Sequence, residues 1–228
     1  MHDTFPSRPV RRGAGAASLV VAAALLLSAC GGGDSASSNK ADKVPGADTG
    51  TKTAAPSASA SADGIERPDI TLPKDVKNVF EGWQTGDPQQ DAVLADSRRH
   101  INAIDAAVTE GTPQTKKFPA VDFYTKDAAL LDAYQYIASF YKAGQSFSGT
   151  ARYYNQHVKL QNTGAASVTY CADETTAYTK DRKTGKVEKG TPSSDDYILY
   201  NTQLKKNTKG VWQTVVITSD GGAKACQR

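Results

Sequence analysis

Two histidines beyond the first thirty residues, His100 and His157, are the side chains best suited to acid–base chemistry near neutral pH. His100 follows Arg98 and Arg99 on a predicted helix, where we expect it to be half exposed, and no catalytic motif accompanies it. His157 lies in a predicted strand and could act as a general acid or base only if it faced the concave side of a sheet. The ordinary alternative is a strand histidine with one ring nitrogen in solvent.

Other residue patterns that could carry chemistry have structural explanations. Gly144–Gly149 comes close to a nucleophile elbow around Ser146, but the glycine after the serine is missing and the predicted order is helix to strand, the reverse of that motif. The acidic pairs Asp173-Glu174 and Asp195-Asp196 fall at predicted strand or loop edges, where solvated turns and edge protection explain them. No zinc, calcium, phosphate-loop or dinucleotide motif occurs in the sequence. The sequence therefore predicts no catalytic residue, no cofactor and no metal, and it favours a non-enzymatic protein over an enzyme.

Aromatic density is the most prominent chemical feature of the chain. The 37 residues from Phe118 to Tyr154 carry ten of its 18 aromatic side chains. One interpretation is a core between helices and a sheet, together with surface tyrosines. The other is a patch or pocket mouth that binds something apolar with polar edges. For that second interpretation the candidate ligand-binding residues are Tyr136, Phe140, Tyr154 and His157.

Helical periodicity dominates the first half of the folded part. Val76, Val79, Phe80 and Trp83 fall on one stripe of a short predicted helix. A second predicted helix begins at Asp87-Pro88, which combines a good N-cap with proline at the first helical position, and runs to Val108. A third is expected from about Thr125 to Ala143, before Gly144.

The second half is rich in Thr, Tyr and Val and changes to strand periodicity. In one strand Val168 and Tyr170 alternate with Thr169 and Cys171. The strands are expected at Phe147–Leu160, Ala166–Ala172, Asp196–Leu204 and Val211–Thr218, with a hairpin tip at Lys183–Lys186. Helices followed by successive strands predict an α+β fold: three N-terminal helices packed on a curved antiparallel sheet of four to six strands.

The charge balance argues against one class of partner. The chain has 27 basic and 24 acidic residues, a net charge of +3. A dedicated nucleic-acid binder carries a strongly basic domain or stripe. We therefore expect no nucleic-acid partner.

The first thirty residues read as an export signal. Arginines at 8, 11 and 12 precede the apolar run Leu19–Leu27, which ends in Leu27-Ser28-Ala29-Cys30. This ending resembles the lipobox of bacterial lipoproteins. The resemblance implies a signal peptide over 1–29, a diacylglyceryl group on Cys30, and a mature protein held outside the cytoplasmic membrane by lipid. Arg11-Arg12 leaves twin-arginine export open beside the general secretory route.

A tether is expected between the lipid and the folded domain. Residues 30–64 are rich in Gly, Ala, Ser and Thr, and Val44 is their only large apolar residue, so we expect them to be disordered. The folded domain then spans 65–228. Once Cys30 is acylated, Cys171 and Cys226 are an even pair in an oxidising compartment, which predicts a disulfide.

The predicted element order resembles the cone-shaped, cystatin-like fold of the nuclear transport factor 2-like superfamily. Within it, residues 168–226 resemble uncharacterised secreted and lipid-anchored proteins of high-GC Gram-positive bacteria. The residues that carry this resemblance are Val168–Asp173, Asp181–Lys186, Gly210-Val211-Trp212 and Cys226. The resemblance implies a fold and a disulfide but no activity, because the superfamily includes isomerases, dehydratases, cyclases and binding modules.

Three functions stay open on the sequence. The favoured one is a binding or accessory module of the cell envelope, attached to the membrane through Cys30 and contacting an envelope protein or a small apolar ligand. The alternatives are a small extracellular isomerase- or cyclase-like enzyme with a conical pocket and a purely structural envelope protein. An ionisable side chain that points into the cone would favour the enzyme, and a filled cone would favour the structural protein.

Overall fold

The computed structural model describes residues 64–110, 117–161 and 164–228. The predicted signal peptide over 1–29, the lipid site Cys30 and the predicted tether, apart from Gly64, lie outside these residues. In the described part, no helix is both long and apolar enough to cross a membrane.

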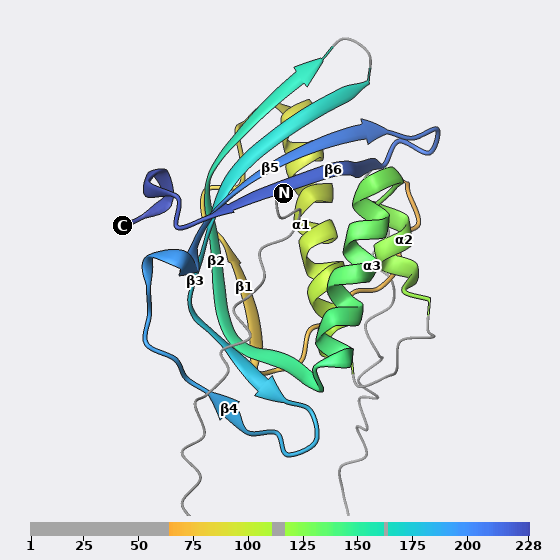
Figure 1. Cartoon of the computed structure of the whole chain (residues 1–228). Helices are drawn as coiled ribbons and strands as arrows, with labels where there is room; N and C mark the ends of the chain where they lie inside the picture. The colour runs from red at the N-terminus through yellow and green to blue at the C-terminus, as the bar shows by residue number, and fades with distance from the viewer. Residues whose placement is uncertain (1–63, 111–116, 162–163) are drawn as a thin grey trace, which may run out of the picture. The chain divides into compact units, whose positions relative to one another are not determined.

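Six strands form one sheet in the order β1-β2-β3-β5-β6, and the short β4 pairs with β3 beside that path. The longest strands, β2 and β3, bend together, with register shifts in β2 at Thr150/Arg152 and Tyr154/His157 (Figure 1). The strands are β1 Val76–Phe80, β2 Gln145–Gln161, β3 Ala165–Asp181, β4 Val187–Glu188, β5 Tyr197–Lys206 and β6 Trp212–Gly221.

The helices α1 Pro88–Thr109, α2 Pro119–Tyr124 and α3 Asp127–Lys142 cover one face of this sheet (Figure 1). The predicted start of α1 is confirmed, since the Asp87 carboxylate accepts hydrogen bonds from the backbone N–H groups of Gln89 (2.7 Å) and Gln90 (3.1 Å). The third predicted helix corresponds to α3. The short α2 was not predicted. The domain is thus α+β, with its helices packed on a mixed sheet.

The predicted helix over 76–83 is wrong, because Val76–Phe80 forms strand β1. This strand runs parallel to β2, from Val76 opposite Gly149 to Phe80 opposite Tyr153, so the sheet is mixed rather than antiparallel. The Phe80 ring stacks on Tyr153 with centroids 4.9 Å apart, and Trp83 meets Phe80 edge-on at 4.9 Å. Two valines and an aromatic residue suit a strand at least as well as a helix, and so short a segment fits both periods.

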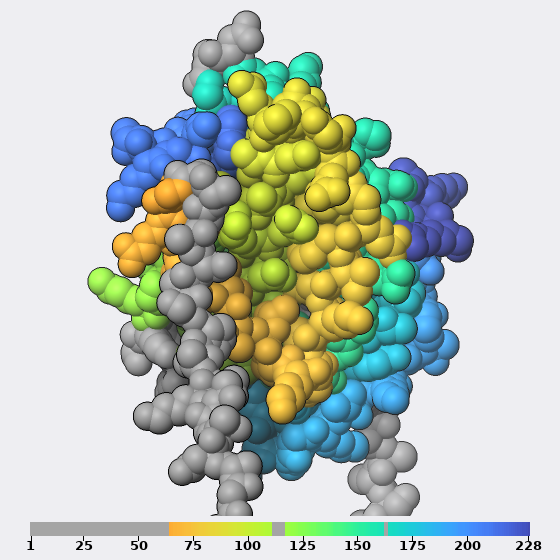
Figure 2. Space-filling model, turned by 180° about the vertical axis from the view of Figure 1, so that it is seen from behind, coloured from red at the N-terminus to blue at the C-terminus, as the bar shows by residue number. Residues whose placement is uncertain are grey.

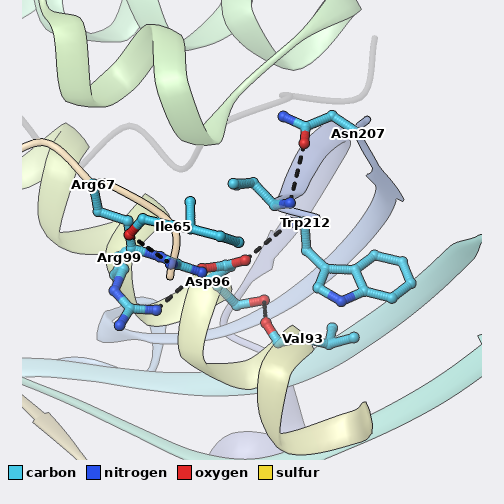
Figure 3. Close-up of polar contacts among 9 residues, drawn as sticks. Ile65, Arg67, Val93, Asp96, Arg99, Asn207 and Trp212 are labelled. Atoms are coloured by element: carbon cyan, nitrogen blue, oxygen red, sulfur yellow. Dashed lines mark hydrogen bonds and ion pairs between the residues drawn. The ribbon is translucent and has the colours of Figure 1, made fainter. Parts of the chain in front are cut away.

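A buried ionic cluster around Asp96 holds three segments together (Figure 3). The Asp96 side chain is 2% exposed, and its Oδ1 accepts from Arg67 Nη2 at 3.3 Å and Arg99 Nη1 at 3.1 Å. Its Oδ2 accepts from the backbone N–H of Trp212 at 2.9 Å. The cluster therefore joins the chain before β1 to α1 and to the first residue of β6. Seen from behind, α1 lies at the surface with residues of that preceding chain beside it (Figure 2).

The predicted disulfide between Cys171 and Cys226 is present, with Cα atoms 5.4 Å apart. It joins β3 to the 3₁₀ turn Lys224–Cys226 near the C-terminus. Tyr170 and Ala172, the neighbours of Cys171 on β3, pack in the core under the helices, whereas Cys171 packs with Tyr154. The disulfide therefore lies on the face of the sheet away from the helices.

Candidate functional site

A cavity of about 40 Å³ lies between the helices and the sheet. Its walls combine apolar, aromatic and ionisable side chains from two helices and four strands. They are His100, Ile101, Ile104, Asp105, Tyr136, Tyr153, Tyr170, Glu174, Tyr200 and Ile217. A volume of this size holds about three water molecules, so the interior is nearly but not completely filled.

The two-residue repeat of a strand and the 3.6-residue repeat of a helix place these side chains on the faces that line the cavity. On β3, Tyr170 and Glu174 are four residues apart and therefore face the same side of the sheet. Tyr200 on β5 lies directly opposite Tyr170. On α1, Ile101 and Asp105 are one turn apart and lie on the same face of the helix.

His100 is buried, contrary to the half-exposed position expected from its two arginine neighbours. It is 2% exposed, and burial lowers its pKa to about 4, so the imidazole is neutral at pH 7. Nδ1 lies 2.9 Å from Thr125 Oγ1. Nε2 is buried and has no hydrogen-bond partner among the described residues. His100 therefore presents an unused polar atom beside the cavity.

Two carboxylic acids also line the cavity. Asp105 is 4% exposed, and its Oδ2 accepts a hydrogen bond from Asn78 Nδ2 at 2.8 Å. Glu174 is 7% exposed, so the solvated edge position expected for it is wrong. Its neighbour Asp173 lies within strand β3 rather than in a turn, and its Oδ1 accepts hydrogen bonds from the backbone N–H of Thr175 at 3.0 Å and from the Thr175 hydroxyl at 2.7 Å. One residue of this acidic pair thus faces the interior and the other caps the backbone.

The second acidic pair also divides between interior and surface. Asp196 is buried, and its Oδ2 accepts from the backbone N–H of Ser193 at 2.6 Å, as part of a capping box. Asp195 is exposed. The capping role agrees with the turn explanation for this pair.

The tyrosines of the cavity are packed against one another. Tyr170 and Tyr200 stack with centroids 4.9 Å apart and rings 15° from parallel, and Tyr153 meets Tyr170 edge-on at 6.1 Å. Burial raises the pKa of Tyr170, with smaller contributions from Asp105 and Glu174. Burial likewise raises the pKa of Tyr200, and Glu174 adds to the effect. Both phenols therefore stay protonated and can donate hydrogen bonds at neutral pH.

Of the four candidate ligand residues, the structure brings only Tyr136 and Phe140 to the interior. Tyr136 lines the cavity and meets Phe140 edge-on, with centroids 5.2 Å apart. Phe140 lines an adjoining cavity, also of about 40 Å³, which shares Glu174 with the first and includes Phe147.

Tyr154 and His157 do not belong to this interior. Tyr154 is 5% exposed and packs against the disulfide, its hydroxyl donating to the Cys226 carbonyl, so its expected place on a binding surface is wrong. His157 is exposed. Its neighbour in the strand, Val158, packs on the core, which places the imidazole on the other face of β2. The condition for acid–base chemistry by His157, a concave-side position, is therefore not met.

A larger hollow, of about 700 Å³, lies between residues 68–73, the C-terminal half of α1 and the start of α2. Its walls are mainly Pro, Ala, Ile and Leu. Among the described residues that line it, the ionisable ones are Asp69, Glu110 and Lys117, and none of them is buried. The rim at Glu110 and Lys117 borders 111–116, which are outside the described residues. The smaller cavity carries the convergent polar groups that a ligand site needs, so we place the candidate site there.

No family model and no curated protein matches the chain. Among solved structures, a ketosteroid isomerase-like protein from Erwinia carotovora atroseptica SCRI1043 is similar at a TM-score of 0.38 and 16% identity, covering 57% of this chain and 93% of the other. A protein from Catenulispora acidiphila is similar at a TM-score of 0.34 and 11% identity, covering 58% and 94%.

Proposed function

We propose that this protein is a lipid-anchored binding module outside the cytoplasmic membrane, and that its interior cavity holds a small ligand. The export signal and the lipobox-like ending at Cys30 support the anchor. The disulfide between Cys171 and Cys226 fits an oxidising compartment. The cone-shaped fold that the order of helices and strands resembles would give such a module a concave interior.

The observation that carries the proposal is the polar chemistry inside the cavity. A core that only stabilises a fold gains nothing from an unpaired imidazole nitrogen, because a buried polar atom without a hydrogen bond costs about 1–3 kcal/mol. His100 Nε2 is such an atom, and Asp105 and Glu174 line the same space. A polar ligand in the cavity gives Nε2 the partner that the described protein groups do not provide.

The test is whether the protein carries a ligand that leaves when the cavity is filled. Native mass spectrometry of the lipoprotein, purified gently from the cells that make it, should detect a bound small molecule. Ile217→Phe takes up space inside the cavity, and we expect the molecule to be lost. Val216→Phe adds the same ring one residue away, where the side chain is 37% exposed, and should retain it.

Two outcomes would contradict the binding proposal. One is a wild-type protein that carries no small molecule under these conditions. The other is equal retention by Ile217→Phe and Val216→Phe. Urea unfolding of both variants is the control that each is folded. It is needed because a larger side chain in the core can lower the free energy of unfolding by about 1–3 kcal/mol.

One observation favours a second function, an enzyme that moves a proton. Ionisable side chains do line the cavity, and Glu174 lies on the same face of β3 as Tyr170. In such an enzyme Glu174 or Asp105 would accept the proton and Tyr170 would donate a hydrogen bond to the developing oxyanion. Conversion of the co-purified molecule by wild type but not by Glu174→Gln, with its binding preserved, would establish this function over simple binding.

A further inference from the structure

The charge of the candidate cavity is one-sided. The ten described residues that line it include two carboxylic acids and no lysine or arginine. The one basic side chain, His100, stays uncharged at neutral pH because of its burial. An anionic ligand would be buried beside Asp105 and Glu174 without a positive partner, which is costly in a medium of low polarity.

The aromatic lining suits a positive charge. Four tyrosines line the cavity, and the electron-rich face of a phenol ring attracts a cation, most strongly where water is excluded. Carboxylic acid groups among aromatic rings thus provide both charge pairing and cation–π attraction. A neutral apolar ligand would use neither.

The free nitrogen of His100 points to a hydrogen-bond donor on the ligand. In the tautomer in which Nδ1–H donates to Thr125 Oγ1, Nε2 carries a lone pair and is an acceptor. Nε2 has no partner among the described residues. An ammonium group has three N–H donors and could serve Nε2 and a carboxylate together.

The adjoining cavity gives room for the rest of such a ligand. It shares Glu174 with the first cavity, and its described lining includes the rings of Phe140 and Phe147 as well as the polar residues Thr175, Thr179, Glu188 and Asp196. Both volumes are about 40 Å³, which limits the ligand to a short chain unless side chains move. An apolar chain that extends from Glu174 toward these two rings would bury its methylene groups there.

From these observations we infer that the ligand is a short-chain primary amine in its ammonium form. The ammonium group is received by Glu174, Asp105 and His100 Nε2, and the alkyl chain lies toward Phe140 and Phe147. This inference rests on the proposed ligand-binding function of the same cavity and names its ligand class.

Three probes with the same n-butyl chain and head groups of different charge test it: n-butylammonium, 1-butanol and pentanoate. Each is titrated into the purified mature lipoprotein in detergent while the ring nitrogens of the histidines are followed by NMR. We expect n-butylammonium to shift His100 saturably, with an affinity at least about ten-fold above that of 1-butanol. Pentanoate should leave His100 unchanged, and His157, exposed on the other face of β2, should respond to none of the probes.

A charge-removing variant gives a second readout. Glu174→Gln should weaken n-butylammonium binding about ten-fold or more. Asp220→Asn removes an exposed carboxylate of β6 and should bind as wild type does. The comparison of probes on wild type stands by itself if Glu174→Gln fails to fold.

The outcomes distinguish a failure of the amine inference from a failure of the ligand-binding proposal. If 1-butanol binds as well as n-butylammonium, or pentanoate binds better, the cavity is a ligand site but not for amines. If no probe shifts His100 and no small molecule co-purifies, the binding proposal falls as well.

Discussion

His100 illustrates how the surroundings of one side chain decide its chemistry. A histidine beside two arginines on a helix resembles a surface residue, yet α1 turns its imidazole into the core next to Thr125. Burial then removes its positive charge at neutral pH. The same residue that lacks a catalytic motif in sequence has, in the fold, a buried ring nitrogen without a hydrogen-bond partner among the described residues.

We predict that His100 makes the domain less stable in mild acid. Its pKa is about 4 when folded, against 6.5 for the ordinary value that the unfolded chain approaches. Between these values the unfolded state binds more protons, so the free energy of unfolding should fall by about 3 kcal/mol as pH drops from 6.5 to 4. Urea unfolding at several pH values measures this loss.

Two variants separate the contribution of His100 to the pH dependence of stability from that of the carboxylates that titrate in the same pH range. His100→Gln should remove most of the pH-dependent loss, whereas His157→Gln, at an exposed position, should retain it. An identical pH dependence in wild type and His100→Gln would show that the buried histidine is not the source.

Tyr154 should behave as a core residue. Because its ring packs on the disulfide and its hydroxyl donates to the Cys226 carbonyl, Tyr154→Ala should lower the free energy of unfolding by about 3 kcal/mol. Tyr154→Phe keeps the ring and should cost about 1 kcal/mol. Chemical denaturation distinguishes these values. A stability of Tyr154→Ala equal to wild type would restore the surface-binding interpretation of this residue.

At the scale of elements, patterns within short stretches of sequence predicted helix α1 and strand β3. The Asp87-Pro88 start predicted α1, and the predicted alternation of Val168 and Tyr170 with Cys171 agrees with the opposite faces that these side chains take on β3. The same alternation continued to Glu174 places its side chain inside, so that part of the site could be found from the sequence.

The rest of the site depends on contacts between distant segments. Strand β1 exists because β2, about seventy residues later, offers a parallel edge, and no local period contains that information. Likewise, Asp105 lies on the buried face of α1, together with other ionisable residues. Helical periodicity predicts apolar side chains on that face, so it did not indicate that Asp105 lines the cavity.

The Asp96 cluster should be essential for joining these elements. Asp96→Ala would leave Arg67 and Arg99 without their shared carboxylate and the Trp212 N–H without its acceptor. Loss of one partner from a buried ion pair costs about 3–5 kcal/mol, and we expect a decrease of that size in the free energy of unfolding. Asp132→Ala, on the partly exposed face of α3, is the matched control and should change stability little. Equal midpoints in urea for the two variants would refute the role of the cluster.

At the scale of the whole molecule, the proposed lipid anchor would place the cavity outside the cytoplasmic membrane. We predict that Cys30→Ala abolishes acylation, so the protein stays uncut or is released to the medium. Detergent phase partitioning of cell fractions, combined with the mass of the processed N-terminus, measures this. Partitioning of a processed Cys30→Ala protein into the detergent phase would contradict the lipid assignment.

The central claim is that the cavity beside His100 is a ligand site. A crystal structure of the protein purified from the cells that make it, without added ligands, tests this most directly. Our account predicts a small molecule within hydrogen-bond distance of His100 Nε2 and next to Glu174. A cavity that contains only ordered water, or that is closed by Tyr136 and Tyr170, would contradict it.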